Sequence, residues 1–269
     1  MMNILVCVKQ VPDTTEIKID PEKNTLIRTG VPSIVNPYDA YALEAAACIK
    51  DKDPDTRIIV VSMGPPQAEA ALRQCLAVSA DKAYLVSGKG FGGSDTLATS
   101  YILSNVVKKL EEIEGKPFDA IFCGKQAIDG DTAQVGPELA EHLNLPQVTY
   151  ALEAEDAGEI LRFRREIDEG YAIVEVKKPC LATFTKPVRE PRYPTIKGKI
   201  AAARAEIPVI SEDDLPGLDR TKIGLKGSPT RVKKTFVQTA KKNCFMISEA
   251  SEVQSVAKLI GMLKDDKVI

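Results

Sequence analysis

The sequence predicts an α/β fold, a doubly wound and mostly parallel sheet of the Rossmann-like kind. Over residues 3–150 short apolar runs alternate with longer amphipathic segments, and the runs are apolar throughout, as strands buried on both faces are. The expected strands are residues 4–8, 57–62, 83–86 and 120–123. The expected helices are residues 39–52, 66–78 and 95–112, and one that follows Asp131.

The second half of the chain has a different pattern. Apolar alternation over residues 161–166 and 172–176, on either side of Asp168-Glu169-Gly170, predicts an antiparallel hairpin that extends the sheet. Residues 186–232 are rich in Pro, Gly and Lys without clear periodicity, so we expect an extended segment that is functional or packs on something else. Residues 248–264 predict an amphipathic helix capped at Ser248. These patterns place a domain over residues 1–185 and an arm with a terminal helix over residues 186–269.

Composition excludes several function classes. The chain has 269 residues, 44% of them hydrophobic and 28% charged, and a net charge of −2, which does not favour binding to nucleic acid or to an anionic membrane. No apolar run reaches the roughly 18 residues that span a bilayer. The six cysteines are scattered and the only histidine is His142, a pattern that argues against a zinc site, a disulfide framework and Ser-His-Asp catalysis. A reducing cytoplasm is the simplest compartment.

The most informative stretch is CGKQAIDGDTAQVGPELAEHL, residues 123–143. It leaves an expected strand, passes through a loop rich in Gly and Asp, and enters an expected helix. Such loops bind anions in α/β proteins, because free amide groups and the positive end of the helix dipole converge there. A well-capped turn explains the same residues, with Asp131 as N-cap and Gly130 in the left-handed conformation.

Five separated strings carry a resemblance to a known family. They are LVCVKQVPDT (5–14), NPYDAYALEAA (36–46), VVSMGPP (60–66), GKQAIDGDTAQVGP (124–137) and REPRYPTIKGK (189–199). Together they resemble the electron transfer flavoprotein β (small) subunit, over nearly the whole chain and in family order. The resemblance implies an adenine-nucleotide site that holds AMP or a flavin.

Carried onto this sequence, the family's nucleotide pocket is implied at strand ends and along the loop after residue 123. The implied residues are Cys7, Asn36, Pro37, Tyr38, Asp39, Met63, Gly124, Lys125, Gln126, Ala127, Ile128, Asp129, Gly130, Asp131, Thr132, Ala133, Gln134 and Val135. Cys7 and Met63 would form apolar walls, and the loop amides after Asp129 would hold phosphate. Tyr38 is expected either to pack the start of its helix or to reach toward a flavin held by the partner subunit.

A second loop, FGGSDTLATS at residues 91–100, resembles the branch of the family that performs flavin-based electron bifurcation. In that branch FAD replaces AMP, and Thr96, Ala98 and Thr99 become candidate contacts. Helix capping by Ser94 or Asp95 explains the same loop. It also resembles the pyrophosphate loop of ATP pyrophosphatases, although that loop follows the first strand of its sheet and this one does not.

The resemblance also implies a function. The chain would be the small subunit of a heterodimer with a large (α) subunit, and it would bind FAD. Electrons would come from NADH. They would pass to ferredoxin or flavodoxin and to a second FAD, which serves a flavin-dependent dehydrogenase of the acyl-CoA dehydrogenase kind. No side chain need be catalytic, no metal is expected, and oxidoreductase activity would require the complex. Val188, Arg189, Glu190 and Pro191 would dock the dehydrogenase, and residues 186–269 would dock on the large subunit. The alternatives are a simple carrier with structural AMP, and an adenine-nucleotide hydrolase or sensor.

Overall fold

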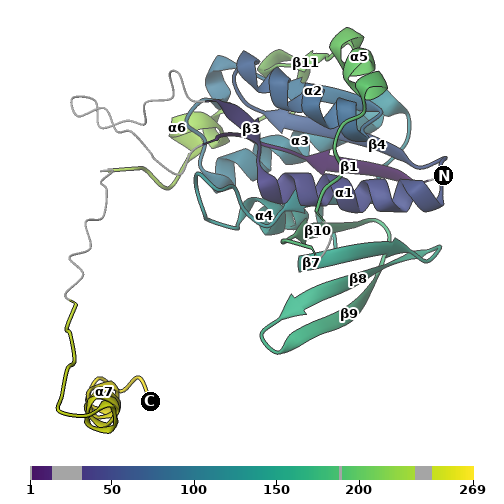
Figure 1. Cartoon of the computed structure of the whole chain (residues 1–269). Coiled ribbons are helices and arrows are strands. Elements are labelled where there is room, and N and C mark those ends of the chain that lie inside the picture. Colours follow the sequence, from purple (N-terminus) through teal and green to yellow (C-terminus); the bar gives the residue numbers. More distant parts are fainter. Residues whose placement is uncertain (1, 14–31, 188–189, 234–243) are drawn as a thin grey trace. The chain divides into compact units, whose positions relative to one another are not determined.

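The computed structural model describes residues 2–13, 32–187, 190–233 and 244–269. The chain forms two compact units, Met1–Lys233 and Lys234–Ile269. The first unit is an α/β sandwich, shown in Figure 1, and it contains every strand of the described residues.

Nine of the described strands form one sheet in the order β11-β5-β4-β1-β6-β10-β7-β8-β9. All neighbours from β11 to β7 are parallel, whereas β7, β8 and β9 form an antiparallel meander. The strands are β1 (Asn3–Cys7), β4 (Arg57–Met63), β5 (Lys82–Val86), β6 (Ala120–Gly124), β7 (Gln147–Asp156), β8 (Ile160–Ile167), β9 (Gly170–Lys177), β10 (Cys180–Phe184) and β11 (Val209–Ile210). A separate antiparallel pair joins β2 (Gln10–Pro12) to β3 (Ser33–Val35).

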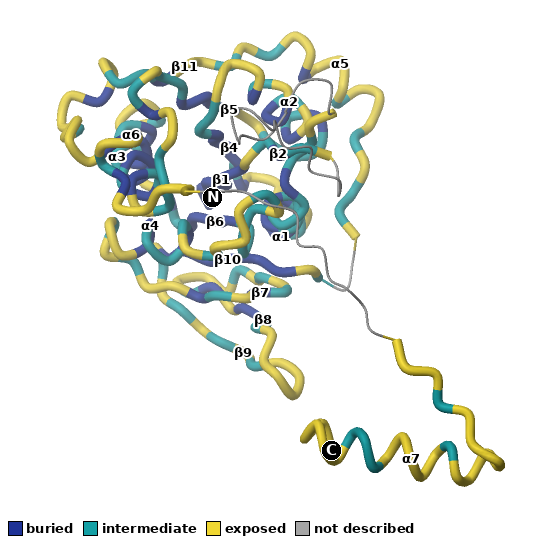
Figure 2. The backbone as a smooth tube through the Cα atoms, turned by 90° about the vertical axis from the view of Figure 1, so that its left-hand side faces the viewer, coloured by how far each residue is buried: buried dark blue, intermediate teal, exposed yellow. Residues whose placement is uncertain are grey.

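Helices cover both faces of the sheet. The main helices of the first unit are α1 (Pro37–Lys52), α2 (Glu69–Val78), α3 (Thr96–Glu114), α4 (Val135–Leu143) and α5 (Ile196–Arg204). Shorter helical turns are η1 (Pro66–Ala68), η2 (Lys89–Phe91), η3 (Glu212–Asp214), η4 (Arg220–Lys222) and α6 (Gly224–Gly227). Ile4 and Val6 of β1 pack on one face with α1 and α2, and Leu5 and Cys7 pack on the other with α3 and α4. Figure 2 shows the parallel strands as the most deeply buried part of the unit.

The chain order of the strands reverses at β1. From β1 the chain proceeds outward to β4 and β5, and α3 then carries it back to β6 on the other side of β1. Open α/β sheets bind ligands outside the carboxyl ends of the strands at such a reversal. The fold therefore places a site beyond Cys7 and Gly124, the last residues of β1 and β6.

The predicted doubly wound sheet and antiparallel hairpin are confirmed, and three local expectations are corrected. Residues 186–232 are not simply extended, because α5 packs on α2 and β11 pairs with β5. The helix after the 124–134 loop begins at Val135 with Gln134 as N-cap, so Asp131 is not its cap. Asp131 has φ 53°, and Gly130 is not among the residues with positive φ.

The second unit contains α7 (Glu252–Asp265). Its cap is Ser251, whose side chain accepts a hydrogen bond from the Gln254 amide, and not Ser248 as the sequence suggested. Apolar side chains along α7 are exposed, including Val253 and Val256, and the helix has no buried residue. No helix in the described part of either unit is long and apolar enough to cross a membrane.

Candidate nucleotide-binding site

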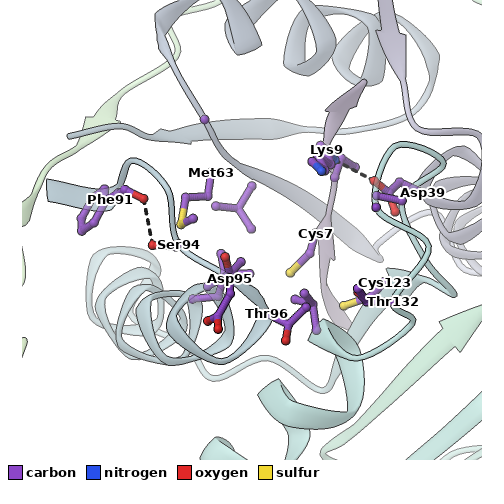
Figure 3. Close-up of a pocket in the computed structure, with 18 of the residues that line it drawn as sticks. Cys7, Lys9, Asp39, Met63, Phe91, Ser94, Asp95, Thr96, Cys123 and Thr132 are labelled. Atoms are coloured by element: carbon purple, nitrogen blue, oxygen red, sulfur yellow. Dashed lines mark hydrogen bonds between the residues drawn. The ribbon is translucent and has the colours of Figure 1, made fainter. Parts of the chain in front are cut away.

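A cavity of about 820 Å³ lies at the predicted reversal point. Strand ends supply its floor, with Cys7 from β1, Met63 from β4 and Cys123 from β6, and Figure 3 shows these side chains around one space. Two loops form its walls, and we call them the first loop (residues 124–134, after β6) and the second loop (residues 87–95, after β5). The volume lies in the upper part of the range of roughly 300–1,000 Å³ that is usual for ligand sites.

The start of α1 connects the ends of β1 and β6 to the first loop. Asn36 is buried; its side-chain amide donates to the carbonyl of Gln126 at 2.8 Å, and its side-chain oxygen accepts from the amide of Ile128 at 3.2 Å. One oxygen of Asp39 accepts from the Lys9 amide at 2.6 Å, and the other from the Gly124 amide at 3.1 Å. These two side chains therefore set the path of the chain where it leaves β6.

Asp39 is a buried carboxyl group at the edge of the cavity. Burial raises its pKa to about 7, although the amides of Lys9 and Gly124 and the Lys9 charge favour the ionised form. Lys9 has a second partner, because its ammonium group lies 2.6 Å from Asp129 of the first loop. Asp129 is thus engaged in an ion pair and does not cap α4.

The first loop presents unpaired amides to the cavity. Gln134 makes no side-chain cap to α4, and within the described residues no acceptor takes a hydrogen bond from the amides of Thr132, Ala133 or Gln134. Residues 132–136 all line the cavity. Asp131 faces away from the helix amides, with its carboxylate accepting from the Gln126 side chain at 2.5 Å. An uncapped helix start with free N–H groups fits a phosphate group.

The second loop approaches the first across the cavity. Asp95 is the N-cap of α3, and its carboxylate accepts from the Ala98 amide at 3.1 Å. The Thr96 hydroxyl lies within hydrogen-bond distance of Gln134 and Glu138, at 3.3 and 3.2 Å. Lys89 of the second loop and Lys125 of the first add cationic side chains to the lining. The cavity thus runs between two helix starts, of which that of α4 has no side-chain cap.

Most residues implied by the sequence come together here. Those that line the cavity are Cys7, Asp39, Met63, Thr96, Thr99, Gly124, Lys125, Gln126, Ala127, Gly130, Thr132, Ala133, Gln134 and Val135. The others lie outside the lining: Asn36, Pro37, Tyr38, Ala98, Ile128, Asp129 and Asp131. Asn36, Asp129 and Asp131 support the first loop, and the Ala98 amide is taken by Asp95. Tyr38 packs edge-to-face on Tyr41, with ring centroids 6.0 Å apart.

The individual contact residues named from the sequence cover only part of the lining, although the FGGSDTLATS string already contains residues 91–95. The additional residues are Val8, Lys9, Val61, Gly64, Pro65, Pro66, Ser87, Gly88, Lys89, Phe91, Gly92, Gly93, Ser94, Asp95, Leu103, Cys123 and Gly136. Many directly follow β1, β4 or β5, so the carboxyl ends of the predicted strands were a signal for them. His142 lies apart from the cavity lining and packs on Tyr101, with ring centroids 5.8 Å apart.

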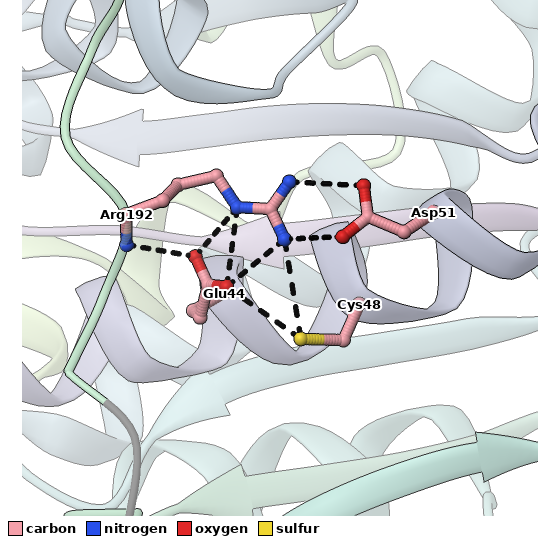
Figure 4. Close-up of polar contacts among 4 residues, drawn as sticks. All are labelled: Glu44, Cys48, Asp51 and Arg192. Carbon is pink, nitrogen blue, oxygen red and sulfur yellow. Dashed lines mark hydrogen bonds and ion pairs between the residues drawn. The ribbon is translucent and has the colours of Figure 1, made fainter.

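The expected docking segment lies elsewhere on the first unit. Val188 and Arg189 are outside the described residues, Glu190 is exposed and Pro191 is half-buried. Arg192 anchors the chain just after this segment, because its guanidinium forks between Glu44 at 2.9 Å and Asp51 at 2.6 Å, both on α1 (Figure 4). The hydrogen bonds from Arg192 hold the pKa of Asp51 below its usual value. Beside this anchor Tyr193 and Ile196 are 91% and 80% exposed.

Comparison with known proteins decides the family. The model of the electron transfer flavoprotein domain matches residues 23–215. The chain belongs to the electron transfer flavoprotein β subunit family. It is 48% identical over 271 residues to the electron transfer flavoprotein subunit beta of Megasphaera elsdenii, and 46% identical over 270 residues to the caffeyl-CoA reductase-Etf complex subunit CarD of Acetobacterium woodii. It is 40% identical over 273 residues to the acryloyl-CoA reductase electron transfer subunit gamma of Anaerotignum propionicum. All three comparisons cover 100% of both chains.

Membership in the β subunit family indicates the class of ligand to consider for this site. Electron transfer flavoproteins are associated with flavin, and their β subunits pair with an α subunit and serve dehydrogenase or reductase complexes. In this β subunit the cavity at the sheet reversal, with free amides at the α4 start and an apolar floor, has the features of a nucleotide site.

Proposed function

We propose that this β subunit holds FAD in the cavity between the two loops and takes part in electron bifurcation within a heterodimer. The observation that carries the proposal is the extent of the cavity. It continues from the amides at the α4 start past Thr96 to Lys89 and Phe91 of the second loop, and so it reaches well beyond one phosphate site. The relative named as a subunit of a caffeyl-CoA reductase-Etf complex supports a role in bifurcation.

Separate groups of lining residues fit separate parts of a dinucleotide. The free amides of residues 132–134 and those at the start of α4 would hold the pyrophosphate. Cys7, Val61 and Met63 form an apolar wall suited to an aromatic ring. Thr96 and Thr99 would contact the half of the molecule that extends along the second loop. The chain thus supplies binding and orientation, and none of its side chains is assigned a catalytic role.

When bound, FAD would supply the redox chemistry, for which NADH is the expected electron donor, and ferredoxin or flavodoxin and a second FAD in the large subunit are the expected acceptors. Exposed apolar surface offers places for the partners. Tyr193 and Ile196 lie beside the anchored Arg192 and extend the expected docking segment for a flavin-dependent dehydrogenase. The apolar side chains of α7 would pack on the large subunit.

Structural AMP is a second candidate, favoured by the α4 start alone. The free amides there suffice for a single phosphate, and an adenine could lie on Cys7 and Met63 without use of the second loop. In that case the chain would belong to a simple electron carrier, and the second loop would have only a structural role.

The experiment that separates the two is a count of bound nucleotides. The chain would be purified together with its large subunit, and the released FAD and AMP would be quantified per heterodimer. Two FAD and no AMP are expected. One FAD with one AMP would refute the bifurcating proposal, and ATP turnover by a heterodimer without flavin would favour a hydrolase.

A further inference from the structure

The second loop has little support of its own. Its internal hydrogen bonds are short-range turn contacts. Backbone bonds run from Phe91 to Gly88 at 3.2 Å, from Gly92 to Lys89 at 3.4 Å and from Ser94 to Phe91 at 3.4 Å, and the Ser94 hydroxyl also donates to the Phe91 carbonyl at 2.8 Å. Its other hydrogen bonds outside α3 are made with residues 210–230, more than 120 positions later in the chain. The conformation of this cavity wall is therefore set from outside the loop.

Two glycines allow this later segment to approach closely. The Gly90 amide donates to the carboxylate of Glu212 at 2.5 Å, and a Cβ on Gly90 would lie 2.6 Å from that carboxylate. Gly224 has φ 60°, its amide donates to the Ser94 hydroxyl at 3.0 Å, and a Cβ there would lie 2.3 Å from the carbonyl oxygen of Gly90. A larger residue at Gly224 would require movement of the backbone, whereas at Gly90 it would displace the Glu212 side chain.

Asp95 is the centre of a contact that we call the clasp, formed by Asp95, Ser228 and Thr230. One carboxylate oxygen of Asp95 caps α3, and the other accepts from Thr230 twice, from the amide at 3.0 Å and from the hydroxyl at 2.8 Å. The Asp95 amide donates to the hydroxyl of buried Ser228 at 2.9 Å. Burial acts to raise the pKa of Asp95, but these hydrogen bonds outweigh it and hold the pKa below its usual value.

We propose that Thr230, acting through the clasp, is a positioning residue for the part of the nucleotide site formed by the second loop. The same carboxylate fixes the start of α3, where Thr96 and Thr99 line the cavity. The first loop is held independently by Asn36 and Lys9. Loss of the clasp should weaken binding of a ligand that spans both loops, and leave a mononucleotide on the first loop almost unaffected.

This inference rests on the proposed function, and it is tested on the purified full-length chain with Thr230→Val. Titration calorimetry would measure the affinities for FAD and AMP separately. We expect FAD affinity to fall about tenfold, near the lower end of the effect of losing one hydrogen bond to a charged group, with AMP affinity changed less than about twofold. Thr230→Ser, which keeps the hydroxyl, should restore FAD affinity.

Thr221 provides a matched control. Its amide and hydroxyl donate to Asp219 at 2.9 and 2.7 Å, the same motif as at Thr230, but Thr221 is not part of the cavity lining. Thr221→Val should leave FAD affinity unchanged. Unchanged FAD affinity in Thr230→Val, or equal losses for FAD and AMP, would overturn the clasp proposal. Failure of the unaltered chain to bind FAD would refute the proposed function itself, together with this role of the second loop.

Discussion

The two loops that wall the cavity follow β6 and β5 of the same sheet, on opposite sides of β1 and β4, but they are built differently. The first loop leads into α4, whose start has no side-chain cap, whereas the second leads into α3, whose start is capped by Asp95. A capped helix has already used amide groups that an anion would need. The difference indicates that the first loop is suited to phosphate, and that the second loop contributes shape and hydroxyl groups.

The loops also differ in how their backbones are held. Asp131 and Ala133 of the first loop adopt positive φ without being glycine, and the loop is braced by Asn36. In the second loop the positive φ falls on a glycine, Gly93, and the bracing segment uses another, Gly224. The first loop therefore stores backbone strain that its contacts must overcome, while the second avoids it.

Removing the brace of the first loop should have the largest effect. Asn36→Leu leaves the Gln126 carbonyl and the Ile128 amide without their partner in a buried setting. The free energy of unfolding should fall by about 1–3 kcal/mol for each unsatisfied group, measured by urea denaturation. Asn105→Leu is the control, since among the described residues the Asn105 side chain bonds only the Tyr101 carbonyl, one turn earlier in α3, and its loss should cost little. Equal losses in the two variants would contradict a bracing role for Asn36.

A methyl group on the brace of the second loop should have an intermediate effect. Gly224→Ala combines φ 60° with a Cβ 2.3 Å from the Gly90 carbonyl oxygen, so the free energy of unfolding should fall by about 1–3 kcal/mol. Thermal unfolding would measure the loss. Gly217→Ala, where an added Cβ meets nothing within 4 Å, should be nearly neutral. If Gly224→Ala were as stable as Gly217→Ala, the second loop would not be held by residues 212–230.

Relief of strain in the first loop should have the smallest effect, and the opposite sign. Ala133 has φ 55°, a conformation that costs roughly 1–2 kcal/mol for a non-glycine residue. Ala133→Gly should raise the free energy of unfolding by up to about 1 kcal/mol once the greater entropy of unfolded glycine is subtracted. Ala127→Gly in the same loop, where φ is not positive, should lower it. Urea denaturation of both variants would measure the difference in their free energies of unfolding. A loss of stability in Ala133→Gly would show that the backbone at Ala133 is not strained.

Local pattern in the sequence predicts only part of this architecture. Apolar runs such as residues 4–8 identify strands buried on both faces, and the capping residue Asp95 is among the expected alternatives. The type and position of Asp131 suit a cap of α4, but its carboxylate pairs with Gln126 instead. The contacts of Glu212 and Thr230 with the second loop join residues more than 120 positions apart, and no local pattern announces them. The location of the cavity was predictable, whereas the support of its second wall was not.

The buried carboxyl of Asp39 has a consequence for solution conditions. Because its pKa rises from the ordinary 3.8 to about 7 on folding, the folded chain binds more protons than the unfolded chain between those values. This group therefore makes the free energy of unfolding decrease as pH rises from about 4 to 7, by at most about 1.4 kcal/mol per pH unit, with no further change above that range. Asp39 accepts hydrogen bonds from the amides of Lys9 and Gly124, at the ends of β1 and β6. Protonation of Asp39 therefore directly affects the hydrogen bonds that hold the floor of the cavity. Ligand binding there is expected to exchange protons with the solvent near neutral pH.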